Sequence, residues 1–305
     1  MDTLDLSFRD LKAVDLVARL QHFGRAAESL GIAQPSLSAQ VSKVERALGV
    51  TLFERSTRRF LITADGARLL PLLRAALDHH HNLLAAAHPK TLRPAPLQIG
   101  LIPTLGAYFA PILLNAAGAS RIDITISEEP TAILLSKLQD GELDAALLSI
   151  PIRHESIASI PLFDEPFRLL VPQGHDLMRL RPLSPAALDA SHMVLLSEGH
   201  CLRDQALSIC SRRGSPSPRL VATSLETLKY LVAAGEGYTL LPALASHIPR
   251  GLRERVELRH FDARCPYRRI GICTRKTLPD RARVNSLAAA LRKHTPKDQD
   301  LRIIA

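Results

Sequence analysis

The sequence of 305 residues predicts an α/β protein in three parts: a winged helix-turn-helix domain, a linker helix and a two-lobed α/β region. Three observations support this fold class. A short helix, a glycine turn and a second helix fit residues 24–48, a proline-rich stretch occupies 89–96, and strands alternate with helices after it. We therefore expect domains at 1–63, 64–96 and 97–305.

The composition is that of a soluble globular protein, with 46% hydrophobic and 23% charged residues. No run of about eighteen apolar residues occurs, and the start of the chain lacks a basic segment followed by an apolar one. We therefore expect a cytoplasmic protein with no membrane partner and with reduced cysteines at rest. The net charge of +9 is compatible with binding nucleic acid, but most of the excess lies in residues 250–305. A solvated basic tail is the commoner explanation of such a run.

The helix-turn-helix prediction depends on residues 25–48. A short helix ends at Gly31, and the next helix carries a proline in its first turn and a buried stripe that includes Leu37 and Val41. In such a unit the N-terminal part of the second helix faces the major groove of double-stranded DNA. The DNA-facing residues that we expect are Gln34, Pro35, Ser36, Ser38, Gln40 and Lys43. An exposed polar face of a helical bundle is the alternative.

A hairpin and a long helix follow. Arg55, Arg58 and Arg59 stand between two strand-like runs, where a wing would reach a phosphate or the minor groove; a solvated hairpin is the alternative. Thr63 is expected to cap a helix over 64–87. Three consecutive histidines on this helix, at 79–81, lack other metal ligands at suitable spacing, so we expect no metal site.

Residues 97–305 read as two α/β lobes built on parallel sheets, because strands and helices alternate along them. Strands are expected at 97–102, 122–126 and 145–148, with a helix at 131–140 between the last two. The run 163–166 would cross to a second lobe. Two lobes joined by crossovers resemble the periplasmic-binding-protein fold, in which ligands bind between the lobes at strand ends and helix N-termini.

Two cysteines flank a segment rich in good helix formers. Cys201 and Cys210 are nine positions apart, so a helix would separate them by about 13 Å. A disulfide needs α-carbons about 4.4 to 6.8 Å apart, and the segment would have to refold to form one. His200 and Arg203 would place positive charge near Cys201, and with the helix start they would favour a thiolate that peroxide oxidises. Ordinary buried cysteines are the alternative.

Several strings carry a family resemblance. Residues 34–38 read QPSLS, 52–55 read LFER and 199–206 read GHCLRDQA. Further matching strings are LIPT at 101–104, PLFDEP at 161–166 and TSLETL at 223–228. Together they resemble the LysR-type transcriptional regulators from about residue 7 to about residue 293, and the 199–206 string is typical of the peroxide sensors of that family. Ala33 departs from the family pattern, which usually has serine or threonine there, so a side-chain cap of the second helix and a phosphate contact would be missing.

The resemblance implies a redox pair and a pocket. Cys201 and Cys210 would form a reversible disulfide, with the peroxide pocket formed by Thr104, Thr131, His200, Arg203, Asp204 and Arg269. Both threonines read equally well as plain helix caps. The remaining thiols, Cys265 and Cys273, are expected to be buried or incidental.

The functional expectation is therefore a regulator and not an enzyme, with no cofactor, that activates oxidative-stress defence genes. The resemblance implies homodimers and homotetramers on dyad-symmetric sites, with hydrogen peroxide as the signal and RNA polymerase as a partner. Two alternatives stay open: a small organic effector bound in the inter-lobe cleft, and a thiol peroxidase that turns peroxide over.

Overall fold

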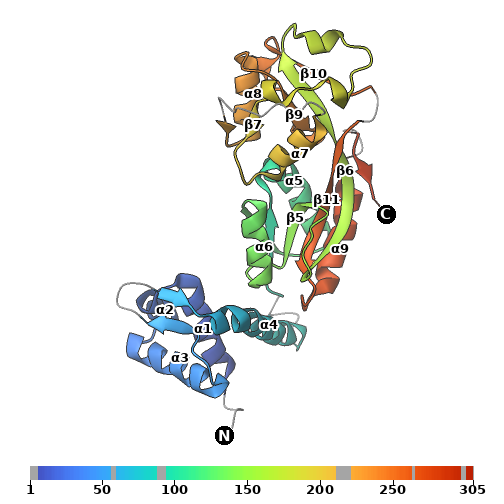
Figure 1. Cartoon of the computed structure of the whole chain (residues 1–305). Helices are drawn as coiled ribbons and strands as arrows, with labels where there is room; N and C mark the ends of the chain where they lie inside the picture. The colour runs from blue at the N-terminus through green and yellow to red at the C-terminus, as the bar shows by residue number, and fades with distance from the viewer. Residues whose placement is uncertain are drawn as a thin grey trace. The chain divides into compact units, whose positions relative to one another are not determined.

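The computed structural model describes residues 6–55, 60–87, 94–210, 221–262, 265–296 and 300–304. The chain divides into two compact units, shown in Figure 1. Unit 1 comprises 1–96 with 139–142, and unit 2 comprises 97–138 with 143–305. None of the helices in the described part of the chain is long and apolar enough to span a membrane.

Unit 1 contains a three-helix core, a hairpin and a long helix. Its elements are α1 (Phe8–Leu20), α2 (Phe23–Leu30), α3 (Gln34–Leu48), β1 (Phe53–Arg55), β2 (Phe60–Ile62) and α4 (Ala64–Ala87). Gly31 ends α2 and Gly49 ends α3, both at positive φ, where glycine is unstrained. Val14, Leu37 and Val41 are fully buried in the core. The helix-turn-helix of the prediction is therefore confirmed as α2 and α3.

The helix caps of unit 1 agree with the sequence in part. Thr63 accepts a hydrogen bond from Gly66 N at 2.9 Å, so it caps α4 as predicted. Ala33 is the N-cap residue of α3 and makes no side-chain cap bond, so the predicted missing cap is confirmed. Helix α2 begins at Phe23, two residues before the expected start at residue 25, and its N-cap is His22, whose imidazole accepts from the Arg25 N–H.

Unit 2 is built on one large mixed sheet of eight strands, in the order β10-β6-β11-β5-β3-β4, with β9 and β12 also paired to β6. The strands are β3 (Leu97–Leu101), β4 (Ile124–Glu128), β5 (Ala145–Ile150), β6 (Ile157–Pro172), β9 (Thr239–Pro242), β10 (Val256–Arg259), β11 (Tyr267–Arg275) and β12 (Arg302–Ile303). A separate parallel pair is formed by β7 (Leu195–Leu196) and β8 (Val221–Ala222). The helices are α5 (Pro103–Ala119), α6 (Thr131–Gln139), α7 (Cys201–Ile209), α8 (Leu225–Ala233) and α9 (Arg281–His294), with short 3-10 turns at Asp176–Arg179, Pro185–Ala187, Ala190–His192, Ala243–Ala245 and Arg250–Leu252.

The long strand β6 runs through both lobes, and β11 pairs antiparallel with its first-lobe part, beside it in Figure 1. In the first lobe β3 pairs in parallel with β4 and with β5, as predicted. In the second lobe β9 and β10 pair antiparallel with β6, which differs from the parallel sheet that we expected. The reason is that β6 continues from the first lobe as the central strand of the second lobe, and β9 and β10 run along it in the opposite direction.

Each lobe has its own hydrophobic core. Phe109 and Phe163 pack in the first, with ring centroids 5.3 Å apart. Helix α7 buries Leu202 and Ala206 in the second core, yet Cys201 at its start packs against the first. The start of α7 therefore lies where the two lobes of unit 2 meet.

Candidate functional site

The two cysteines stand at the two ends of α7. The helix runs for nine residues from Cys201, His200 is its N-cap residue, and Cys210 is its C-cap residue. Both thiols are free. Because a helix rises about 1.5 Å per residue, their α-carbons are about 13 Å apart, well beyond disulfide range. The predicted helical separation of the two cysteines is confirmed.

Cys201 is half-buried and has a polar partner on the first lobe. Thr131, the first residue of α6, makes a side-chain hydrogen bond to the Cys201 sulfur. Burial raises the pKa of Cys201, while the charge of Arg268 and the Thr131 bond act in the opposite direction. The thiol therefore stays mainly protonated at neutral pH, unlike the thiolate that the sequence suggested.

The positive charge near Cys201 comes from a residue that the sequence analysis did not select. Burial lowers the pKa of His200, so its imidazole is neutral at pH 7. Arg203 donates to the Leu196 carbonyl at 3.0 Å. The predicted positive charge on His200 is therefore absent at neutral pH, and the cation whose charge lowers the pKa of Cys201 is Arg268.

Arg268, on β11, is held in a buried network with Glu165 on β6 and Thr104 on α5. Its Nε lies 2.8 Å from Oε2 of Glu165, and both side chains are fully buried. Its Nη1 donates to the Thr104 hydroxyl at 2.8 Å and its Nη2 to the Thr104 carbonyl at 3.1 Å. Glu165 also accepts from Leu244 N at 2.8 Å. The guanidinium thus makes one bond to Glu165 and two to Thr104, which fix its position.

Three predicted pocket residues lie differently from what we expected. Arg269 pairs with Asp164 through bonds of 2.6 and 2.9 Å, and 42% of its side chain is exposed. Successive residues of a strand face opposite sides, so Arg268 points inward and Arg269 outward. Thr104 lies within the first turn of α5, whose N-cap residue is Ile102, so Thr104 is not the cap that we considered. Asp204 is exposed, and its charge raises the pKa of Cys201.

Gln205 also belongs to this site and was missed. It lies one turn after Cys201, and its Nε2 donates to Ser149 Oγ on β5 at 2.6 Å. Its Oε1 is buried with no hydrogen-bond partner in the described part of the chain. The i, i+4 spacing from Cys201 is the signal that would have identified it.

Cys210 has surroundings of another kind. Its Sγ is buried, 3.1 Å from Sδ of Met193 and 3.4 Å from the Ala206 carbonyl oxygen. Burial, together with the charge of Asp189, raises the pKa of Cys210 to about 11. At neutral pH this sulfur carries its proton.

The other two thiols lie away from α7. Cys273 is fully buried on β11, 3.4 Å from Ser159 Oγ, and burial raises its pKa to about 11. Cys265 is exposed, with Sγ 3.6 Å from the Phe167 carbonyl oxygen. Among the described residues, no group of three or more His, Cys, Asp or Glu side chains is placed to hold a metal ion.

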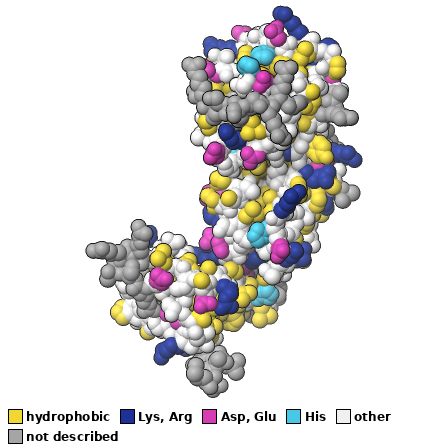
Figure 2. All heavy atoms as spheres, in the orientation of Figure 1, with side chains coloured by type: hydrophobic (Ala, Val, Ile, Leu, Met, Phe, Trp, Pro, Cys, Tyr) yellow, Lys and Arg dark blue, Asp and Glu magenta, His cyan; other side chains and the backbone are white. Residues whose placement is uncertain are grey.

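The predicted DNA-facing residues lie on the first turns of α3. Gln34, Pro35 and Ser36 are exposed, and Ser38 and Gln40 are half-buried. The Nζ of Lys43 lies 3.0 Å from a carboxylate oxygen of Asp10, so this amine already has a partner on α1. The side chain of Arg55, and Arg58 and Arg59 entirely, lie outside the described residues. On the face of unit 1 drawn in Figure 2, the Lys and Arg side chains of the described residues are scattered.

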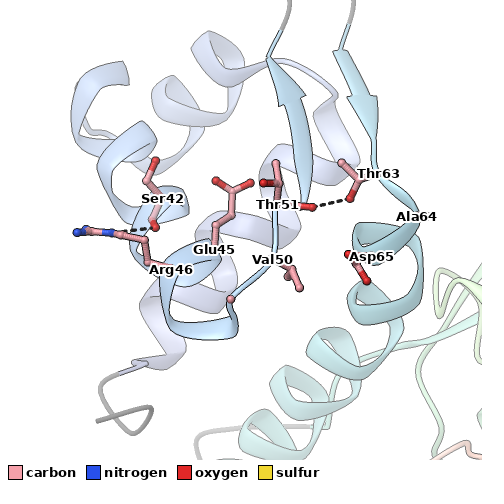
Figure 3. Close-up of a pocket in the computed structure, with 9 residues that line it drawn as sticks. Ser42, Glu45, Arg46, Val50, Thr51, Thr63, Ala64 and Asp65 are labelled. Carbon is pink, nitrogen blue, oxygen red and sulfur yellow. Dashed lines mark hydrogen bonds between the residues drawn. The ribbon is translucent and has the colours of Figure 1, made fainter. Parts of the chain in front are cut away.

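Among the hollows that described residues line, two lie elsewhere. One, of about 810 Å³, is bounded by the C-terminal half of α3 and the start of α4, and Figure 3 shows it with the Thr63 hydroxyl donating to the Thr51 carbonyl at 2.6 Å. None of the predicted DNA-facing residues lines it. The other, of about 380 Å³, is in the second lobe and is bordered by Asp189, His192 and Tyr238. Cys201 lines neither of them.

Both units match known protein families. Residues 8–67 match the bacterial regulatory helix-turn-helix protein family of the lysR type, and residues 90–296 match the LysR substrate binding domain. The second match alone covers more than half of the chain. This chain therefore belongs to the LysR family of bacterial helix-turn-helix regulatory proteins.

Within the family, the similar proteins have closely related names. The chain is 37% identical over 292 residues to the DNA-binding transcriptional dual regulator OxyR of Escherichia coli K12, covering 94% of this chain and 95% of that one. It is 36% identical over 301 residues to a probable hydrogen peroxide-inducible genes activator of Mycobacterium leprae, covering 97% and 96%.

Two solved structures are also similar over nearly the whole chain. Full-length OxyR of Pseudomonas aeruginosa, with one cysteine replaced by aspartate, has a TM-score of 0.77 at 33% identity, covering 94% of this chain and 97% of that one. OxyR of Corynebacterium glutamicum, with one cysteine replaced by serine and with hydrogen peroxide bound, has a TM-score of 0.58 at 31% identity, covering 94% and 92%.

Proposed function

We propose that this protein is a DNA-binding transcriptional activator that senses hydrogen peroxide through a reversible disulfide between Cys201 and Cys210. One observation carries the proposal: a thiol beside a buried cation begins a nine-residue helix, and a second thiol ends it. Similar proteins are named hydrogen peroxide-inducible genes activators, which supports hydrogen peroxide as the signal.

The first chemical step takes place at Cys201. Its thiolate attacks one oxygen of hydrogen peroxide, an S–O bond forms, the O–O bond breaks, and the second oxygen leaves as hydroxide. The hydroxide takes up the proton that the thiol released, so one water is formed. Arg268 stabilises the negative charge of the thiolate, and Thr131 donates to the sulfur. The hydroxyl of Thr104, which accepts from Arg268, can donate its own proton to the peroxide.

The second step joins the two sulfurs. Cys210 attacks the sulfur of the Cys201 sulfenic acid, an S–S bond forms, and the S–O bond breaks. Hydroxide leaves and combines with the Cys210 proton, so that one peroxide and two thiols give one disulfide and two waters. For reduction, one cellular thiol attacks the disulfide and frees one cysteine, leaving the other in a mixed disulfide. A second thiol then displaces that cysteine, so that the two cellular thiols end as a disulfide.

Disulfide formation requires α7 to unwind. The α-carbons must approach from about 13 Å to within about 7 Å, which a helix of this length does not allow. Unwinding removes Leu202 and Ala206 from the second core and breaks the bond from Gln205 to Ser149 on the first lobe. This repacking changes the surface of unit 2, and in a homodimer or homotetramer it alters how paired α3 helices meet a dyad-symmetric site. An activator of this kind acts through RNA polymerase.

The test uses Cys201→Ser and Cys210→Ser proteins beside the wild type. DNA footprints before and after dilute peroxide are expected to differ for the wild type and to stay the same for both variants, and mass mapping is expected to find a Cys201 to Cys210 bond. If both variants still change their footprint with peroxide, the thiol switch is wrong, and an organic effector in the inter-lobe cleft becomes the better hypothesis. Repeated turnover of peroxide with a thiol reductant would instead indicate a thiol peroxidase.

A further inference from the structure

We infer that Met193 is a positioning residue for the second step, and that its thioether accepts the Cys210 S–H and holds this thiol back until α7 unwinds. The inference rests on the proposed disulfide between Cys201 and Cys210. It assigns a role to a methionine outside the redox pair and outside the pocket around Cys201.

The contact between the two sulfurs is close and buried. Cys210 Sγ lies 3.1 Å from Met193 Sδ, and the two residues are 8% and 7% exposed. The thiol has one proton, and its other possible acceptor, the Ala206 carbonyl, is farther away at 3.4 Å. A thioether is a weak, polarisable acceptor, which suits a weak S–H donor in an apolar setting.

Met193 sits on a fixed part of the second lobe. It pairs with Tyr238 through a parallel bridge, in which Val194 N donates to the Tyr238 carbonyl at 2.9 Å and Tyr238 N donates to the His192 carbonyl at 3.1 Å. The Tyr238 hydroxyl accepts from Asp189 N at 2.6 Å and donates to the Asp189 carbonyl at 2.8 Å. These bonds fix the backbone on both sides of the methionine.

A glycine permits this close pairing. Gly237 has a φ of +130°, and a Cβ there would lie 2.3 Å from the His192 carbonyl oxygen. Only glycine therefore allows the chain before Tyr238 to approach the Met193 segment so closely. The backbone segment of Met193 therefore stays in place, whereas Cys210 ends the helix that has to unwind.

The consequence is a delay between the two steps. Cys210 must give up both its contact with Met193 and its proton before it bonds to Cys201. An acceptor lone pair stabilises the thiol and repels the thiolate, so the contact disfavours both changes. Because one hydrogen bond contributes modestly to stability, its loss is expected to speed the second step roughly two- to tenfold.

The experiment compares Met193→Leu with Met178→Leu. Both replace a thioether by a side chain of similar volume, which cores tolerate well. Met178 packs against the same core from the turn Asp176–Arg179, and Cys210 makes its sulfur–sulfur hydrogen bond with Met193. Single-turnover kinetics with peroxide, followed by a sulfenic acid probe and by disulfide mass, are expected to show an unchanged first step in both variants. The second step should be faster only in Met193→Leu.

A separate readout examines the reduced protein. In a Cys201→Ser background, the rate of Cys210 alkylation is measured as a function of pH. The midpoint of this profile is expected to shift to lower pH in Met193→Leu and to stay unchanged in Met178→Leu. This shift would not follow from a packing defect alone. Circular dichroism and thermal unfolding check that the variants are folded, and Met193→Ile replaces Met193→Leu if the latter is not.

Each outcome decides the matter. Wild-type kinetics and wild-type alkylation in Met193→Leu would reduce Met193 to a packing residue. Equal acceleration in the Met178→Leu control, or equal changes of both steps, would show a general loosening of the lobe and overturn the inference. If the wild type forms no disulfide at all, the proposed function fails, whereas the alkylation profile still reports on the Met193 contact.

Discussion

The two ends of α7 carry the same residue type in opposite surroundings. Cys201 meets residues of the first lobe: Thr131 bonds to its sulfur, and Arg268 supplies a positive charge. Cys210 meets the sulfur of Met193, a backbone carbonyl and the apolar core of one lobe. The same helix thus begins beside a positively charged side chain and ends in an apolar core.

The comparison teaches that reactivity here does not follow from a low thiol pKa. Burial raises the pKa of both cysteines. The two cysteines differ in the groups around their sulfurs. Arg268 and Thr131 stabilise a thiolate at Cys201, whereas the charge of Asp189 further disfavours a thiolate at Cys210. We therefore expect Cys201 to react with peroxide, and Cys210 to react only afterwards, with the oxidised Cys201.

The largest expected effect comes from removing the cation. Arg268→Met leaves Glu165 buried without its charged partner, so the free energy of unfolding is expected to fall by about 3 to 5 kcal/mol. The sulfenic acid at Cys201 should also form more slowly, because its thiolate loses the nearby charge. Denaturant unfolding and a sulfenic acid probe measure the two effects.

The neighbouring arginine is the matched control. Arg269→Met breaks a partly exposed pair with Asp164, so it should cost at most about 1 kcal/mol and leave the rate at Cys201 unchanged. If the two variants slow the reaction equally, the contrast drawn between the ends of α7 loses its physical basis.

The second effect is a pH dependence of stability from the Cys210 end. The pKa of Cys210 is about 11 when folded, against an ordinary value of 9.0, so the unfolded chain loses this proton first as pH rises. The resulting stabilisation is complete below pH 9 and is lost between about pH 9 and 11. Its size is on the order of 2 kcal/mol.

Thermal unfolding from pH 8 to 10.5 measures this dependence. Cys210→Ala is expected to have a shallower loss of stability with pH than the wild type, with part of the slope remaining because burial also raises the pKa of Cys273 to about 11. Parallel slopes for the two proteins would mean that the Cys210 thiol is not held in its neutral form.

The smallest effect concerns the hydroxyl at the Cys201 end. Thr131→Val keeps the side-chain shape and removes the hydrogen bond to the sulfur, so the pKa of Cys201 is expected to rise further. Sulfenic acid formation at pH 7 should slow roughly three- to tenfold, as expected for the loss of one hydrogen bond of about 1 kcal/mol. Thr131→Ser, which retains the hydroxyl, should react nearly as the wild type, and a serine variant as slow as the valine one would assign the effect to packing.

Local features were predictable because they depend on neighbouring residues. The first helix, Gly31 as the end of α2, the Thr63 cap and the helical start at Cys201 all follow from propensity and capping. The second-lobe sheet was not predictable in this way. Its antiparallel pairing depends on β6 continuing through both lobes, and nothing in a short window of sequence reveals that continuation.

The pocket shows the same limit at single residues. Of two adjacent arginines, pairing of β11 with β6 decides that Arg268 faces inward, and the predicted choice was Arg269. The charge assigned to His200 was wrong because burial, which lowers its pKa, is a tertiary property.

By itself the sequence determined that two cysteines stand nine positions apart in a helix-forming segment, so that they are separated at rest. Only the tertiary structure decided which of them meets a positive charge and which meets a thioether. The physical reason is distance along the chain. Arg268 is 164 positions from the threonine that it binds, and contacts of that range are set by how the strands pair and what the cores bury.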